Sequence, residues 1–333
     1  MTVFTLTRPT IYQAPKGLKF EEFKSLIPDS GRRRLLCTHG DFDTRAALLG
    51  TKIEDHWEPE VKETWMRNHA AIMKGLAYEF GENEIIEKSE RFIEIDTKPM
   101  SIISYHNEFF AQVRSAYVMG HFYPSLVGAC ALGERILNHL IIDMRPMFQN
   151  TAEYQKVYRK NSFDNWDAPI STLEAWGILL PEVAKEFREL KVLRHRSIHF
   201  NKSTYETLRK DSISAVLHMR KIIDCQFGTW GIRPWFISGT KGSTFVAKDF
   251  ELHPFVRTYF APQFPYVGPL FGIRNFEGHG LEVMDVPDYG DGEWTDEEFA
   301  QQFNNRNEDK VIKEPPEMIL AEDAPLFNKQ PSK

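Results

Sequence analysis

The sequence predicts a mainly α-helical protein, for two reasons. Apolar residues recur at helical spacing over most of residues 58–228, whereas strand-like alternation is short over residues 233–250 and weak over 251–290. Hydrophobic residues make up 42% of the 333 residues, which is enough apolar material for a substantial core. We therefore expect a helical bundle with an irregular N-terminal arm and a small, acidic, β-containing C-terminal extension.

Charge and cysteine content exclude several classes of protein. The net charge of −6 excludes a generally basic nucleic-acid binder, so any polyanion site must come from local charge. The three cysteines are far apart and form no CxxC pair, which argues against a zinc knuckle and a disulfide framework. The N-terminus has no signal-peptide profile and no apolar run approaches the length of a membrane span. We expect a cytoplasmic protein with no membrane association.

The expected elements follow one another along the chain. Residues 1–57 contain several prolines and a basic triplet and are expected to be irregular. A helix is predicted over 58–81, with Pro59 near its start and Gly81 at its end. Further helices are predicted over 102–123, over 125–144 after Pro124, in a short stretch after Ser171, from Pro181 onward, and over 203–228. Together they give a helical domain at 58–228.

The C-terminal third has a different pattern. A hairpin is predicted from 233–239 and 243–250, within an extension at 229–275 that is rich in proline and aromatic residues. Residues 276–333 hold 15 acidic and 5 basic residues, and we expect an acidic, partly disordered tail.

Two charged residues interrupt the apolar faces of two predicted helices. At about 100° per residue, Arg194 falls in the middle of the stripe formed by Val183, Phe187 and Leu190. Glu134 falls on the apolar face of 125–144 in the same way. An arginine cannot lose its charge on burial, so it needs a carboxylate, a phosphate or access to water. The two residues form either a buried ion pair that fixes helix register or the lining of a polar pocket.

His199 follows Arg194 on the same helix and adds a group that transfers protons near neutral pH. The two lie about 140° apart on an ideal helix, but a frayed last turn before Asn201 would let them converge on one anion. A histidine for proton transfer and an arginine for charge stabilisation are a minimal set for phosphodiester chemistry.

The stretch RHRSIHF (194–200) resembles the short motif of the HEPN superfamily, in which an arginine and a polar residue precede three variable residues and a histidine. The upstream stretch AYVMGHFYPSLVGACALGERILNHL (116–140) and the long helix after the motif agree with the family's helix order, so the resemblance covers about residues 100–228. It implies a HEPN-like antiparallel helical bundle and a homodimer whose two motifs face a shared cleft. It also implies metal-independent RNA cleavage by 2′-hydroxyl attack, as in toxins and phage-defence effectors, with an antitoxin or defence-system partner.

By this resemblance the catalytic residues would be Arg194, His199, the acidic Glu134, and His195 at the position where the family most often has asparagine. The role of His195 stays open because it adds a titratable group. Residues 181–221 hold 10 basic and 5 acidic residues, which fits either an RNA-binding face or an ordinary solvated one. The candidate RNA-binding residues are Lys191, Arg196, Lys202 and Arg209.

Two other readings remain. The chain is alternatively a non-catalytic HEPN-like module that binds nucleotides or proteins, or an interaction protein whose acidic tail engages a basic partner or its own basic helices. His39, Asp41 and Asp43 lie close enough together for a metal site, but a solvated turn is the favoured interpretation, and no metal or other cofactor is predicted.

Overall fold

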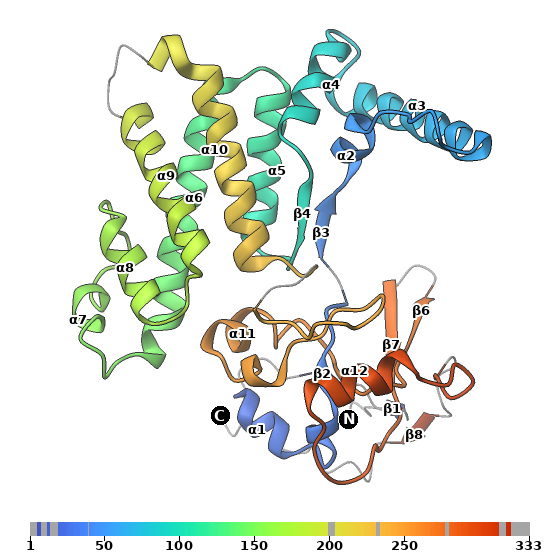
Figure 1. The fold of residues 1–333 in the computed structure, drawn as a ribbon. Helices are drawn as coiled ribbons and strands as arrows, with labels where there is room; N and C mark the ends of the chain where they lie inside the picture. Colours follow the sequence, from blue (N-terminus) through green and yellow to red (C-terminus); the bar gives the residue numbers. More distant parts are fainter. Residues whose placement is uncertain are drawn as a thin grey trace. The chain divides into compact units, whose positions relative to one another are not determined.

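The structure is a computed structural model that describes residues 5–7, 12–13, 19–38, 40–198, 204–230, 234–276, 280–312 and 318–320. It is 57% helix and 8% strand, which confirms the mainly α class (Figure 1). The chain forms two compact units. We call His39–Thr229 the helical unit, and Met1–Thr38 with Trp230–Lys333 the terminal unit.

Four long helices form the bundle of the helical unit. They are α5 (Tyr105–Val118), α6 (Phe122–Met144), α9 (Pro181–Ile198) and α10 (Thr204–Phe227). Helix α6 is the central one, because it packs against α5, α9 and α10 (Figure 1). Its core face includes Leu126, Ile136 and Leu140, each fully buried. Gly133 lets α9 approach closely, since a Cβ there would lie 2.7 Å from Leu190 Cδ2.

The predicted helix boundaries largely agree with the structure. Helix α3 (Pro59–Phe80) begins at its proline and is followed by Gly81, whose φ of +80° is readily adopted only by glycine. Helix α5 is shorter than its predicted range of 102–123, because the chain turns at Gly120 with a φ of +79°. Helix α6 begins before Pro124, which lies in its first turn, where a missing N–H costs nothing.

Smaller elements complete the helical unit. Strands β3 and β4 pair antiparallel, with Asp41 opposite Ser101 and Asp43 opposite Lys98. The remaining elements are β3 (Asp41–Asp43), α2 (Arg45–Gly50), α4 (Ile85–Glu94), β4 (Lys98–Ser101), η2 (Arg145–Met147), α7 (Tyr154–Val157) and α8 (Asp167–Ala175).

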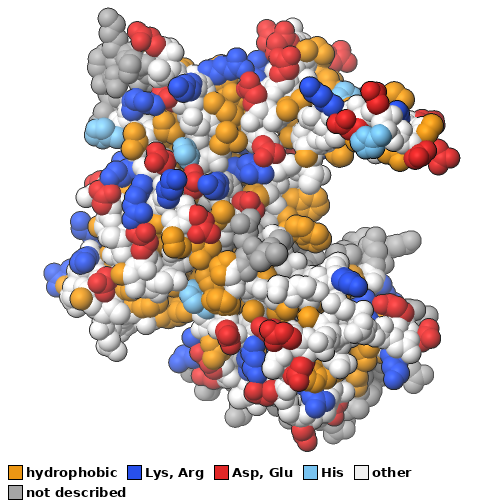
Figure 2. All heavy atoms as spheres, viewed as in Figure 1, with side chains coloured by type: hydrophobic (Ala, Val, Ile, Leu, Met, Phe, Trp, Pro, Cys, Tyr) orange, Lys and Arg blue, Asp and Glu red, His pale blue; other side chains and the backbone are white. Residues whose placement is uncertain are grey.

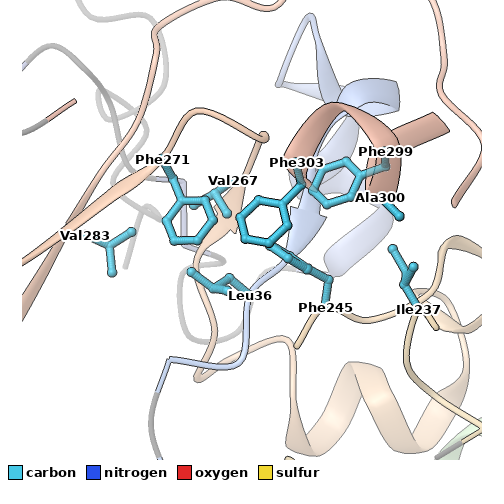
Figure 3. Close-up of a cluster of buried hydrophobic side chains, with 9 residues drawn as sticks. All are labelled: Leu36, Ile237, Phe245, Val267, Phe271, Val283, Phe299, Ala300 and Phe303. Atoms are coloured by element: carbon cyan, nitrogen blue, oxygen red, sulfur yellow. The ribbon is translucent and has the colours of Figure 1, made fainter. Parts of the chain in front are cut away.

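The terminal unit combines both ends of the described chain around an aromatic core. Phe245, Phe271, Phe299 and Phe303 pack there with Leu36, Val267 and other apolar residues (Figure 3). Its elements are β1 (Thr5–Thr7), α1 (Phe20–Ser25), η1 (Ser30–Arg32), β2 (Arg34–Leu35), η3 (Lys248–Phe250), α11 (Pro254–Tyr259), β5 (Tyr266–Val267), β6 (Gly272–Phe276), β7 (Gly280–Met284), α12 (Asp296–Asn304) and β8 (Met318–Leu320). The antiparallel strand pairs are β1–β8, β2–β5 and β6–β7.

Buried ion pairs also join the two ends of the terminal unit. The Arg33 guanidinium is fully buried and lies 2.7 Å from Asp29 and 2.6 Å from Asp285. Arg34 lies 2.8 Å from Asp296, the first residue of α12. Arg33 and Arg34 of the basic triplet are therefore buried and connect segments of the terminal unit, and they do not form a solvent-exposed basic patch.

The contacts divide the chain differently from the four expected segments. Residues 40–50, expected within an irregular arm at 1–57, form β3 and α2 of the helical unit. Residues 19–38 belong with the C-terminal segments expected at 229–275 and 276–333. The reason is that Asp285 and Asp296, which pair with Arg33 and Arg34, lie more than 250 residues away from them, beyond the reach of local patterns.

The C-terminal segments hold more structure than expected. The predicted pairing of 233–239 with 243–250 occurs around one antiparallel bridge between Phe236 and Val246. The β6–β7 hairpin was not predicted. Helix α12, within the expected acidic tail, begins with a capping box in which Thr295 and Glu298 bond each other's backbone N–H groups.

One helical segment, Phe122–Met147, is long and apolar enough to span a membrane by length and composition, with a mean hydropathy of 1.3. It comprises α6, the central bundle helix, and η2, and 56% of its most apolar 18-residue window is buried. This burial favours its role as the core helix of a water-soluble protein.

Candidate functional site

The charges of Glu134 and Arg194 meet between α6 and α9. Arg194 Nη2 lies 2.7 Å from Glu134 Oε2, and its Nε donates to the same oxygen at 3.0 Å. The side chains remain 19% and 26% exposed, respectively. The two helix faces thus bring together the pair that the sequence singled out, and the pair is in contact with water.

Other groups hold Arg194 in place. Its guanidinium lies 5.5 Å from the centre of the Trp166 ring, a cation–π distance. Its Nη1 donates to the Asp164 carbonyl at 3.4 Å, and Ser197 Oγ donates to the Arg194 carbonyl at 3.2 Å. The loop before α8 therefore supplies a second wall of the site, which helix periodicity could not predict.

Cys130 lies beside this pair but is not a nucleophile. Burial raises the pKa of its thiol to about 12, although a hydrogen bond with Ser197 and the charge of Arg194 oppose that rise. The thiol is thus protonated at neutral pH, and a protonated thiol is a weak nucleophile.

Two predicted residues, His199 and Lys202, lie outside the described residues. Helix α9 is described as far as Ile198, so the convergence of Arg194 and His199 stays a prediction. His195 is exposed, while Arg194 is partly buried.

The described candidate RNA-binding residues all have carboxylate partners. Lys191 lies 2.6 Å from Asp167, and Arg209 lies 2.8 Å from Glu94. Arg196 pairs with the buried Asp211. Figure 2 shows blue basic side chains interspersed with red acidic ones over the helical unit. Local pairing therefore weakens the positive surplus that the sequence gives to residues 181–221.

The acidic residues of β3 also have basic partners. Asp41 pairs with Lys98, and Asp43 lies 2.8 Å from Arg45. His39 lies outside the described residues. Among the residues that are described, no group of three His, Cys, Asp or Glu side chains is arranged to hold a metal ion.

Two hollows of the helical unit were not predicted from the sequence. One, of about 550 Å³, includes Glu94, Tyr117 and Arg209 in its lining. The other, of about 450 Å³, lies beside β3 and α5 and contains the buried Arg114. Neither follows a local sequence motif, because each is assembled from several elements.

The chain matches no protein-family model, no curated protein and no solved structure.

Proposed function

We propose that the helical unit is a metal-independent endoribonuclease of the HEPN type. The observation that supports this best is the ion pair of Glu134 and Arg194, which joins two core helices yet remains in contact with water. An arginine that is positioned by a carboxylate and can still reach solvent is suited to bind a phosphodiester. The resemblance of residues 194–200 to the HEPN motif supplies the expected partner, His199.

In the proposed reaction the RNA 2′-hydroxyl attacks the adjacent phosphorus while His199 takes its proton. Arg194 stabilises the negative charge that develops on the phosphoryl oxygens. The 5′-oxygen leaves and gains a proton, so the products are a 2′,3′-cyclic phosphate and a 5′-hydroxyl. Glu134 is a positioning residue that holds the guanidinium.

The cellular setting follows from the same proposal. Two copies of the chain would pair so that both motifs border one cleft. An RNA-cleaving enzyme of this kind would act in the cytoplasm as a toxin or phage-defence effector, restrained by an antitoxin or another partner.

A second candidate function is a non-catalytic binding module. It is favoured by the number of contacts that already engage Arg194: the Glu134 carboxylate, the Trp166 ring and the Asp164 carbonyl. In this alternative the ion pair fixes the packing of α6 on α9, and the unit binds a nucleotide or a protein without catalysing a reaction.

RNA cleavage and RNA binding, measured together in EDTA, separate the two candidates. The nuclease proposal predicts that His199→Ala and Arg194→Met each slow cleavage by about 100-fold or more, while the folded state is retained by circular dichroism. The matched control is His121→Ala, which removes an exposed histidine and should leave the rate unchanged. RNA binding without cleavage by the unmodified protein would contradict the nuclease and support the binding module.

A further inference from the structure

A pocket of about 450 Å³ opens in the helical unit at residues that the proposed function does not use. It is formed by β3 and β4, the start of α2, the end of α3, and α4 and α5. Pockets for small molecules have volumes of roughly 300–1,000 Å³, so its size suits such a ligand. Its lining includes charged and aromatic side chains, namely Phe42, Asp43, Arg45, Phe92, Lys98 and Arg114.

Arg114 is the unusual member of this lining. It is only 5% exposed, and its guanidinium donates to two carbonyls at the end of α4, Ile95 O at 3.0 Å and Asp96 O at 2.6 Å. In the described part of the chain no carboxylate lies within ion-pair distance of it. Buried charges in proteins are normally paired, because an isolated charge loses its hydration without compensation.

The two nearest carboxylates are already bound to other arginines. Asp43 pairs with Arg45 at 2.8 Å, and Asp96 pairs with Arg220 at 2.9 Å. The carboxylates nearest to Arg114 are therefore both engaged by other guanidinium groups. Burial, with smaller effects of the Arg220 and Arg45 charges, lowers the pKa of Arg114 to about 10 against the opposing effect of the two aspartates.

The remaining cations of the pocket are also partly compensated. Arg45 contacts Glu79 at 2.8 Å as well as Asp43, and Lys98 pairs with Asp41. Three basic and two acidic side chains line the pocket, so its lining carries a net positive charge. A phosphate group would supply Arg114 with an anion and accept hydrogen bonds from the basic side chains of the lining.

Aromatic rings stand next to these cations. The centre of the Phe92 ring lies 5.2 Å from the guanidinium carbon of Arg45 and 5.9 Å from that of Arg114. Phe42 is 53% exposed although it lines the pocket, so a flat ligand could stack on it.

We propose that this pocket binds a small phosphomonoester that carries a planar ring, with a nucleoside monophosphate as the simplest biological example. The phosphate contacts Arg114 and Arg45, and the ring lies against Phe42. This inference is independent of RNA cleavage, because it uses none of the residues assigned to that reaction.

Isothermal titration calorimetry of the full chain with phenyl phosphate, inorganic phosphate and benzoate tests the proposal. Phenyl phosphate should bind more tightly than either of the other two probes. Arg114→Met should weaken its binding by about tenfold or more, because a charge-assisted contact is lost. The matched control is Arg135→Met, which removes an exposed arginine that lies over Phe109 on α5.

Phe42→Ala gives a second variant at an exposed position, where folding is not at risk. It should weaken phenyl phosphate binding several-fold and leave inorganic phosphate binding unchanged. If Arg114→Met does not fold, the proposal is tested with Phe42→Ala and Ser115→Leu. Ser115→Leu places a larger side chain in the pocket and should weaken the binding of phenyl phosphate.

The proposal would be overturned if phenyl phosphate did not bind at millimolar concentration, or if its affinity were the same in the wild type and these variants. Equal binding of benzoate and phenyl phosphate would also contradict it, since a carboxylate would then serve as well.

Discussion

Arg194 shows how a charge within an apolar stripe is accommodated without being sealed from water. Its guanidinium meets Glu134 and lies over Trp166, and 19% of the side chain stays exposed. A partly exposed ion pair contributes only about 0–1 kcal/mol to stability. Stability alone is therefore a weak reason for placing these two charges on the core faces of two helices.

His106 presents the opposite case, a titratable group with no access to water. It is fully buried in α5, and both ring nitrogens lack hydrogen-bond partners in the described chain. Burial, with a smaller effect of the Lys98 charge, lowers its pKa to about 3. The imidazole is therefore neutral in the folded protein throughout the range in which an unfolded histidine gains its proton.

This shift gives a pH-dependent prediction. Below pH 6.5 the unfolded chain binds a proton at His106 that the folded chain does not, so the wild type loses stability until the pH approaches 3. His106→Leu removes this loss. Its free energy of unfolding relative to wild type should be higher at pH 5 than at pH 8 by about 2 kcal/mol, measured by urea unfolding. A difference that is the same at both pH values would contradict the assignment, and His195→Leu controls for loss of an exposed imidazole.

At the scale of elements, periodicity and end signals predicted the bundle well. Helices α3 and α9 begin at their prolines, and the apolar stripes of α6 and α9 correctly place Glu134 and Arg194 on facing sides. The periodicity of the sequence could not predict which exposed charged side chains form ion pairs with residues of other helices. Lys191 and Arg209 looked suited to RNA, yet each meets a carboxylate from a distant helix.

Two glycines in helices should respond oppositely to the same substitution. A Cβ at Gly133 would lie 2.7 Å from Leu190 Cδ2 and 2.9 Å from Trp166, so Gly133→Ala forces these two buried side chains to shift and should cost about 1–3 kcal/mol. A Cβ at Gly75 of α3 meets nothing within 4 Å, so Gly75→Ala should stabilise by about 0.5–1 kcal/mol. Chemical denaturation measures the free energy of unfolding of both variants relative to the wild type. A stabilised Gly133→Ala would show that α6 and α9 are not packed this closely.

At the scale of the whole molecule, the terminal unit depends on contacts between segments far apart in the sequence. Arg33 bridges Asp29 and Asp285, and Leu36 packs with Phe299 in one core. Local patterns describe each segment as irregular or acidic, so the sequence did not predict this unit. The pocket around Arg114 was missed for the same reason, because its lining comes from six elements.

The division into two units can be tested through Arg33. Arg33→Met leaves two buried carboxylates without their cation and should destabilise the terminal unit by about 3–5 kcal/mol. Hydrogen exchange read by mass spectrometry should show faster exchange in residues 19–38, 234–276 and 280–312. Amides of α5, α6 and α10 should keep their protection. Uniformly faster exchange in both units would contradict the separation of their cores.

The chemical nature of the RNA ends after incubation in EDTA tests the proposed nuclease reaction most directly. This reaction leaves a 2′,3′-cyclic phosphate on the upstream fragment and a 5′-hydroxyl on the downstream one. Both should disappear in His199→Ala and on an RNA with a 2′-deoxy residue at the cleaved position. Cleavage that leaves a 5′-phosphate, or that proceeds equally in His199→Ala, would contradict the assignment of Arg194 and His199 to this chemistry.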